Sequence, residues 1–161
     1  MSSEVQDTQK DFPTVLAEAQ LRTQDVLDEV ERLTQFDTDN LDIALNAAPK
    51  NMSHMQRLYY LEGSRLKRFQ DAIKSAKHAR WKHYAGKMPS AHYSKNPLQE
   101  AVQKSDLDRY VDSDPLIQNY NQLLTEYEQR VKAIENGIKM LQTRGYDVKT
   151  VLEYKRFTSG T

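Results

Sequence analysis

Residues 75–88 hold the side chains of this chain that are best suited to chemistry. Their sequence, SAKHARWKHYAGKM, has four fixed positive charges, two histidines, a tryptophan and a tyrosine, and no acidic residue. Cations neutralise the phosphates of a nucleic-acid strand and release its counterions, and an exposed base stacks on a flat aromatic ring. This combination predicts contact with an unpaired strand, with little dependence on base identity. An ordinary solvated helix face is the alternative interpretation of the same charges.

The basic stretch belongs to the one strongly positive part of a neutral chain. The 161 residues contain 23 Lys/Arg and 23 Asp/Glu. Residues 1–50 carry 4 basic and 11 acidic residues (−7), residues 51–95 carry 10 and 2 (+8), and residues 96–161 carry 9 and 10 (−1). A positive block of this size is the electrostatic footprint expected of a polyanion-binding surface. We therefore divide the chain into an acidic N-terminal helical arm (1–35), a helical basic DNA-binding region (36–95) and a helical oligomerisation region (96–161).

Several classes of protein are disfavoured by what the sequence lacks. There is no cysteine, so no disulfide or thiolate metal site is expected. No apolar run approaches the roughly 20 residues of a membrane span. The polar, acidic start MSSEVQDTQKDF is unlike a signal or transit peptide. These features predict a soluble intracellular protein without a membrane association.

Catalytic and metal-binding patterns are equally weak. No phosphate-binding glycine loop, serine-nucleophile or zinc-protease motif is present. His78 and His83 are five residues apart, off the spacing that two helical ligands of one metal need, and we interpret them as a solvated pair. Asp106–Asp112 starts like a calcium loop, but Tyr110 and Val111 stand where a ligand and a glycine are required. We predict a protein that is not an enzyme and has no catalytic residue, metal or cofactor.

The spacing of apolar residues predicts an all-α fold of elongated helices. A long central helix, a coiled-coil-like helix and a short terminal helix are its main elements. The expected helices run from Asp11 to about Phe36, from Leu41 to a stop at Pro49, from Met52 to a glycine cap at Gly86, from Pro97, from Pro115 to Arg144-Gly145, and from Asp147 onward. Residues 87–96 are expected to form a loop.

The helix that starts at Pro115 carries the clearest pattern in the chain. Apolar residues recur with alternating spacings of 3 and 4, which is typical of a coiled-coil seam. An intramolecular helix hairpin and self-association both explain this seam, and we favour self-association because a chain of this length has little volume in which to bury two seams. The residues predicted to form the interface are Ile117, Tyr120, Leu124, Tyr127, Val131, Ile134, Ile138 and Leu141, with Val151 and Leu152 from the terminal helix.

The basic face lies on the long central helix. At 100° per residue, one side of this helix collects cations and an aromatic ring, and the apolar seam occupies another side. Lys77 flanks the basic face, and Arg80 projects near the end of the apolar seam. An exposed base would stack on Trp81 or Tyr84, although packing at the helix end is the simpler role for at least one of these rings. The residues predicted to contact DNA are Lys67, Lys74, Lys77, His78, Arg80, Trp81, Lys82 and Lys87.

At these residues the sequence resembles the UvsY family of phage recombination mediators. The resemblance covers roughly Phe36 to Gly160 and rests on the order of three stretches: FDTDNL with the segment to Leu61, ARWKHYAGKM, and LDRYVDSDP onward to GYDVKTVLEYKRF. The family's Lys-Ala-Arg-Leu motif for single-stranded DNA aligns with His78-Ala79-Arg80-Trp81. Arg80 matches, so the resemblance implies that it contacts DNA. His78 and Trp81 depart from the motif, which implies a pH-dependent contact and a new stacking or packing ring, with Lys77 and Lys82 as compensating cations.

The resemblance implies a ring-like homo-oligomer, assembled through C-terminal helices, that wraps single-stranded DNA without a cofactor. It implies two protein partners, a RecA-like phage recombinase that is loaded onto DNA and a single-strand DNA-binding protein that is displaced. It also implies a location in the cytoplasm of an infected bacterial host. A coiled-coil scaffold without a nucleic-acid role, and an RNA-binding regulator, are the alternatives that the residues themselves leave open.

Overall fold

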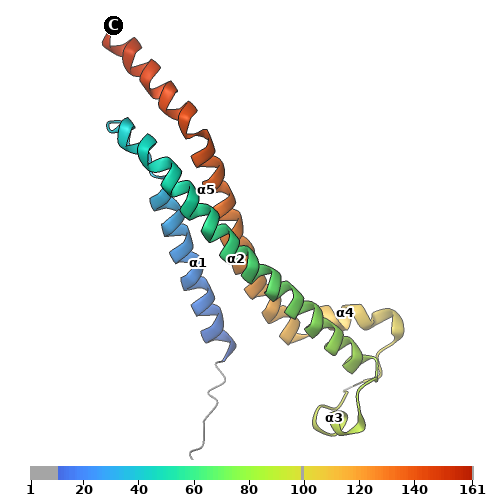
Figure 1. Cartoon of the computed structure of the whole chain (residues 1–161). Coiled ribbons are helices and arrows are strands. Elements are labelled where there is room, and N and C mark those ends of the chain that lie inside the picture. Colours follow the sequence, from blue (N-terminus) through green and yellow to red (C-terminus); the bar gives the residue numbers. More distant parts are fainter. Residues whose placement is uncertain (1–10, 99, 161) are drawn as a thin grey trace, which may run out of the picture. The chain divides into compact units, whose positions relative to one another are not determined.

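All regular structure in the described residues, 11–98 and 100–160 of a computed structural model, is helical (Figure 1). The elements are α1 (Phe12–Thr34), α2 (Leu41–Tyr84), α3 (Ser90–Lys95), the 3-10 helix η1 (Lys104–Asp106), α4 (Leu107–Asp112) and α5 (Pro115–Ser159). The all-α prediction and the prediction of elongated helices are confirmed. None of the described helices combines the length and the apolar character that crossing a membrane requires.

The chain forms two compact units, and the long helices contribute to both. The described residues of unit 1 are 11–20 and 67–125, apart from Gln99, and those of unit 2 are 21–66 and 126–160. Helix α2 therefore passes from unit 2 into unit 1, and α5 passes from unit 1 into unit 2.

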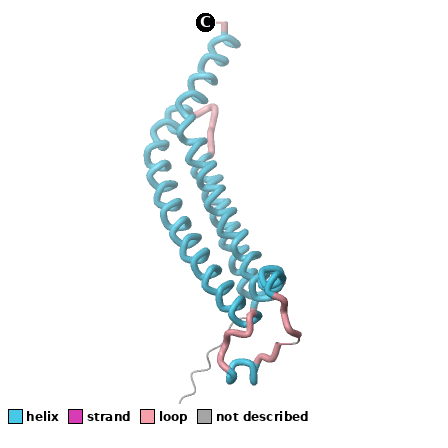
Figure 2. Tube along the Cα trace, turned by 90° about the vertical axis from the view of Figure 1, so that its right-hand side faces the viewer, coloured by secondary structure: helices cyan, strands magenta, loops and turns pink. Residues whose placement is uncertain are grey.

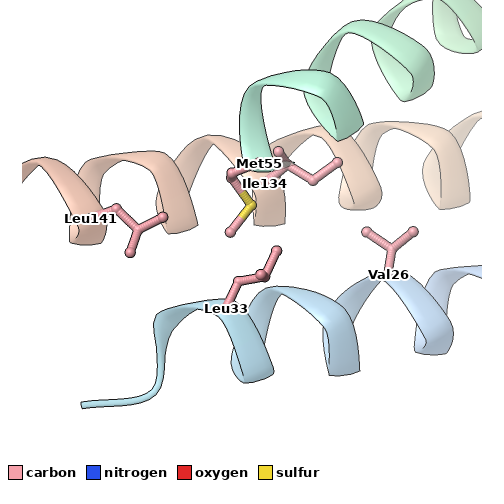
Figure 3. Packing of buried hydrophobic residues seen from close by; sticks show 5 residues of the cluster. All are labelled: Val26, Leu33, Met55, Ile134 and Leu141. Atoms are coloured by element: carbon pink, nitrogen blue, oxygen red, sulfur yellow. The ribbon is translucent and has the colours of Figure 1, made fainter. Parts of the chain in front are cut away.

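The core of unit 2 is built from three helices. Val26 and Leu33 come from α1, Met55 from α2, and Ile134 and Leu141 from α5, and all five side chains are buried. Figure 3 shows these side chains directed into the space between the ribbons. Residues seven apart share one helix face, which explains why the α1 and α5 pairs both point into this core. Each side chain buried in this way contributes about 1.5–3 kcal/mol to folding.

Unit 1 has its own smaller core. Ile73 of α2, Leu107 and Val111 of α4, and Ile117 and Leu123 of α5 are buried there. The short helix α4 is held by two of these side chains, which lie four residues apart on one face. The predicted break at residues 112–115 is confirmed, because α4 ends at Asp112 and α5 begins at Pro115.

The predicted stop at Pro49 is wrong. Helix α2 runs from Leu41 through Pro49 to Tyr84, so the expected short helix is its first part. Proline forfeits one backbone hydrogen bond within a helix, at a cost of about 3 kcal/mol. Leu41, Ala44 and Ala47 before the proline are half-buried at intervals of three, and Met52 and Met55 after it belong to the core of unit 2, so burial on both sides of Pro49 favours a continuous helix.

The predicted stop at Gly145 and the separate terminal helix from Asp147 are also wrong, because α5 continues without a break to Ser159. Arg144 is buried and donates hydrogen bonds to the carbonyl oxygens of Thr34 (2.7 Å) and Gln35 (3.3 Å), at the end of α1. Val148, one turn later, is buried as well. Tertiary contacts on both sides of the glycine thus keep this part of α5 helical. The Arg144 side chain also supplies hydrogen bonds to carbonyl groups that lack an intrahelical donor at the end of α1.

Among the described residues, the segment between α2 and α5 holds most of the non-helical ones (Figure 2). Residues 87–96 were expected to form a loop, but α3 occupies Ser90–Lys95. The helix expected from Pro97 is absent from the described residues 97–98 and 100–103, and the next element is η1. A proline is compatible with the first turn of a helix, but it does not by itself start one.

Two helical glycines differ in what surrounds them, and this predicts opposite responses to alanine. A Cβ at Gly145 would meet nothing within 4 Å, so Gly145→Ala should raise the free energy of unfolding by about 0.5–1 kcal/mol through helix propensity alone. A Cβ at Gly137 would lie 2.8 Å from the Met55 Cε and 3.0 Å from the Val30 Cγ1. In Gly137→Ala, overpacking should therefore outweigh the gain in helix propensity and lower the free energy of unfolding by about 1–3 kcal/mol.

Urea denaturation of the two alanine variants beside the parent chain measures this difference. Equal stabilisation by Gly137→Ala and Gly145→Ala would contradict the close packing of α1 and α2 against Gly137.

Candidate nucleic-acid interface

All eight residues predicted to contact DNA belong to unit 1, seven of them on α2. Gly86 ends this helix with a φ of 70°, which confirms the predicted glycine cap. Its N–H donates to the His83 carbonyl oxygen (3.2 Å), and the N–H of Lys87 donates to the Lys82 carbonyl oxygen (2.9 Å). The turn brings the Lys87 Nζ to 4.5 Å from the centre of the Trp81 ring, so the eighth residue lies beside the last turn of the helix.

Most of the predicted contact residues are free to meet a ligand. Five of the eight are exposed to solvent: Lys67, Lys74, His78, Lys82 and Lys87. Of these, Lys74 lies 3.5 Å from Asp71 in a surface ion pair, an interaction that is worth little. These side chains provide a cationic surface that phosphates could reach without rearrangement of the protein.

Arg80, in contrast, is held by an acidic residue on another part of the chain. Its Nε donates to the Asp114 Oδ2 at 2.6 Å, and the Tyr84 hydroxyl donates to the same oxygen at 2.7 Å. Asp114 is buried, and its other oxygen accepts the Leu116 N–H at 2.9 Å, the contact of a helix N-cap. The arginine thus fastens α2 to the first turn of α5, and a phosphate would have to compete with a buried carboxylate for it.

The directions in which the pKa values of Asp114 and Arg80 are shifted fit a charged pair. Burial by itself would raise the pKa of Asp114, but the hydrogen bonds from Tyr84 and Arg80 and the positive charge of Arg80 outweigh it and lower that pKa. Burial works against the charge of Arg80 too, and the contacts with Asp114 and Tyr84 outweigh it and raise the arginine pKa. Both groups stay ionised at neutral pH.

Lys77 is also paired, but more loosely. Its Nζ lies 2.8 Å from the Asp112 Oδ1, and both side chains keep substantial exposure, 42% and 65%. Exposed pairs of this kind contribute about 0–1 kcal/mol and are screened by salt. A phosphate could therefore replace Asp112 as the partner of Lys77 far more easily than it could replace Asp114 as the partner of Arg80.

The two candidate stacking rings have different surroundings. The Tyr84 ring lies 5.1 Å from the ring of His83 and 5.7 Å from the ring of Tyr110, and its hydroxyl is used by Asp114. Trp81 is half-buried, and its ring is parallel to the ring of His78 within 3°, with 6.4 Å between centres. Tyr84 is thus a packing residue within unit 1, and Trp81 is the ring better placed to meet a base.

His83 is not the solvated residue that the sequence suggested. It is buried, and its Nδ1 lies 3.0 Å from the Nε2 of His92 in α3. Burial, with the charges of Arg80 and His92, lowers its pKa, so the ring is neutral at neutral pH. Among the described residues, no three His, Cys, Asp or Glu side chains gather in a way that could hold a metal ion.

The acidic partners Asp112 and Asp114 are the site residues that sequence reasoning missed. The Asp114-Pro115 step is a recognisable helix start, and it predicted the beginning of α5. It gave no indication that the capping carboxylate also binds an arginine 34 positions earlier. Only the packing of α2 against the α4–α5 junction in unit 1 creates that pair.

Some of the residues predicted to form a subunit interface are buried within the chain itself. Ile117, Ile134 and Leu141 are buried in the cores of the two units. Leu152 is exposed, and the others are half-buried: Tyr120, Leu124, Tyr127, Val131, Ile138 and Val151. The seam is therefore at least partly intramolecular, and self-association stays a prediction for the remaining residues.

The protein is an α-helical protein in which one face of a long helix carries cations and an aromatic ring. Such a face can bind nucleic acid through phosphate contacts and base stacking. A comparison with family models matches residues 29–161 to the family described as "Recombination, repair and ssDNA binding protein UvsY". Because the match covers most of the chain, the chain belongs to the UvsY family of phage recombination and repair proteins that bind single-stranded DNA. No curated protein matched the chain, and no solved structure matched it.

Proposed function

We propose that the protein is a recombination mediator that binds single-stranded DNA without strong sequence preference. It promotes the loading of a RecA-like recombinase in place of a single-strand DNA-binding protein, in homologous recombination, repair and recombination-dependent replication. The observation that carries this proposal is the family match over residues 29–161, whose description names recombination, repair and single-stranded DNA. The match favours DNA binding over a purely structural coiled-coil role.

The proposed DNA contacts are the basic side chains of unit 1 with Trp81. Lys67, Lys74, Lys82 and Lys87 meet phosphates directly, because they are exposed. Lys77 exchanges Asp112 for a phosphate, since that ion pair is solvent-accessible. The same exchange is unfavourable for Arg80, because its partner Asp114 is buried. Arg80 then supports DNA binding by stabilising the position of the basic face, with at most a weaker phosphate contact.

Assembly of several subunits raises the affinity for a DNA strand above that of one subunit. A homo-oligomer presents the basic face several times, so one strand engages several subunits and avidity rises by about 10²–10⁴. We propose that the oligomer bends the strand around its basic rim. A bent strand suits recombinase nucleation better than it suits the single-strand DNA-binding protein, and the difference in affinity for the two strand conformations supplies the free energy. The protein acts in the cytoplasm of an infected bacterial host.

Several exposed apolar side chains lie near the end of α5, in unit 2. Tyr146, Leu152, Tyr154 and Phe157 are all exposed, Phe157 at 87%. We propose that these residues, with the half-buried Val151, contribute to a ring-like assembly, in place of the already buried Ile134 and Leu141. The mass of the native assembly, with and without an oligonucleotide, tests this: a lone monomer under both conditions would contradict it.

Removing one exposed cation from the proposed face should weaken DNA binding without weakening the fold. Each phosphate contact to a single strand contributes about −0.7 to the slope of log affinity against log salt. We expect Lys82→Ala to reduce the magnitude of that slope by about this amount and to change the free energy of unfolding by less than about 0.5 kcal/mol. Fluorescence anisotropy of a labelled oligonucleotide across a salt series measures it.

Lys139→Ala is the matched control, because Lys139 is an exposed lysine of α5 in unit 2, outside the proposed face. It should leave the slope unchanged. If Lys82→Ala and Lys139→Ala both keep the parent slope, the basic face does not bind DNA. Arg80→Ala is a poor substitute for Lys82→Ala in this test, because loss of the Asp114 contact weakens unit 1 as well.

A further inference from the structure

A shallow hollow of about 620 Å³ lies beside the basic face, within unit 1. This is within the range of about 300–1,000 Å³ that small-molecule sites occupy. It is bounded by α2 on one side and α4 on the other. Its lining residues are Lys77, His78, Trp81, Asp108, Val111 and Asp112.

The α2 side of the hollow offers flat rings and a cation. The rings of His78 and Trp81 are parallel, so a planar group that stacks on one ring is parallel to the other. Lys77 is the cation of the lining. Lys87 lies outside the lining, with its ammonium group over the indole, 4.5 Å from the ring centre. A base that rests on Trp81 displaces this ammonium toward the phosphate of the same nucleotide. Stacking of this kind suits any base.

The α4 side of the hollow offers carboxylates, which a site for phosphates alone would not include. Asp108 and Asp112 stand four residues apart and therefore on one face of the helix. Both are exposed, and Asp112 also pairs with Lys77. Carboxylates repel phosphates, but they accept hydrogen bonds from amino groups such as the N4 amine of cytosine. Thymine carries a carbonyl oxygen at the same position and has no amine to donate.

We propose that this hollow binds one unpaired base of a single strand, stacked on Trp81, with its amino edge toward Asp108 and Asp112. The site takes cytosine, and other bases with an exocyclic amine, in preference to thymine. This inference rests on the proposed function and adds to it a subsite that distinguishes bases at one position per subunit. The phosphate contacts of the basic face remain independent of sequence.

The tryptophan of the hollow is the single tryptophan of the chain, so its fluorescence reports on this site alone. The experiment titrates the full-length protein with oligo-dC, oligo-dT and an abasic strand of the same length and charge. Binding is followed by anisotropy of a label on the strand, and base stacking by indole emission. We expect both base-bearing strands to quench the emission, the abasic strand to bind without quenching, and oligo-dC to bind at least about threefold more tightly than oligo-dT.

Two variants separate the ring from the carboxylates. Trp81→Leu should weaken oligo-dC about tenfold and leave the abasic strand unchanged, and the unchanged abasic binding shows that the variant is folded. The double variant Asp108→Ala/Asp112→Ala should bring the ratio of oligo-dC to oligo-dT affinity to one. Asp147→Ala, the same charge change on an exposed residue of unit 2, should keep the parent ratio.

The outcomes distinguish this inference from the proposed function. If the strands bind by anisotropy but indole emission does not change, or if the double variant keeps the parent ratio, the base site is overturned and DNA binding stands. If no strand binds at all, the proposed function fails and the inference fails with it.

Discussion

Glu62→Ala is expected to lower the free energy of unfolding by about 3–5 kcal/mol. Glu62 of α2 is fully buried in unit 2, with its Oε1 3.0 Å from the Nη2 of Arg22 and 2.6 Å from the Nη1 of Arg65. Its Oε2 lies 3.5 Å from the Nε of Arg130, which is also buried. Removing the carboxylate leaves the Arg130 charge inside the protein without its counter-charge, and that cost dominates the expected loss.

The double variant Glu62→Ala/Arg130→Leu tests this explanation, because it removes both charges together. We expect it to recover part of the stability lost in Glu62→Ala, which is the coupling that a double-mutant cycle measures. Glu128→Gln is the matched control: Glu128 is an exposed residue of α5, and its substitution should change the free energy of unfolding by less than about 0.5 kcal/mol. Urea denaturation followed by helical circular dichroism provides the measurements. A Glu62→Ala variant as stable as Glu128→Gln would show that the cluster does not hold the three helices together.

Asp114→Ala should have an effect of similar size, about 3–5 kcal/mol, on the stability of unit 1. The substitution removes the N-cap of α5, and it leaves Arg80 and the Tyr84 hydroxyl without their buried acceptor. Asp112→Ala is the control, because Asp112 stands two residues away and its pair with Lys77 is exposed. Its substitution should cost no more than about 1 kcal/mol.

The contribution of Asp114 should also depend on pH in one direction. Its pKa in the folded chain is below the ordinary value of 3.8, because the contacts with Tyr84 and Arg80 outweigh burial. A lowered pKa gives stability that is present above the ordinary value and is lost as the pH falls below it, through the pKa of the folded state. The difference in unfolding free energy between the parent chain and Asp114→Ala should therefore be largest near neutral pH and shrink below pH 3.8. A difference that grew on acidification would contradict the ion pair.

Local sequence signals determined most of the helical architecture. Apolar residues such as Val26 and Leu33 recur at helical spacing, and the face that they define is the buried face of α1. Gly86 ends α2 because a glycine adopts a positive φ without strain, which is a property of that residue alone. The basic face of α2 was readable too, since positions on one helix follow from 3.6 residues per turn.

Tertiary packing decided where the long helices continue and which charged side chain is buried, and local signals did not predict either. Pro49 and Gly145 weaken a helix by themselves, yet α2 and α5 continue through them. Met52 and Met55 after Pro49 join the core of unit 2, and Arg144 and Val148 on either side of Gly145 are buried. A lone glutamate is not expected in a core, and the three arginines around Glu62 explain its burial.

The candidate site shows the same division. The sequence by itself determined which residues could carry charge and aromatic rings on one helix face, because those positions follow from helix geometry. Only the tertiary structure decided that Arg80 is engaged by Asp114 while Lys82 is exposed, and that Trp81 borders a hollow while Tyr84 is packed. The physical reason is that a side chain's partner depends on which residues the fold brings within a few ångströms, and for Arg80 that residue lies 34 positions away.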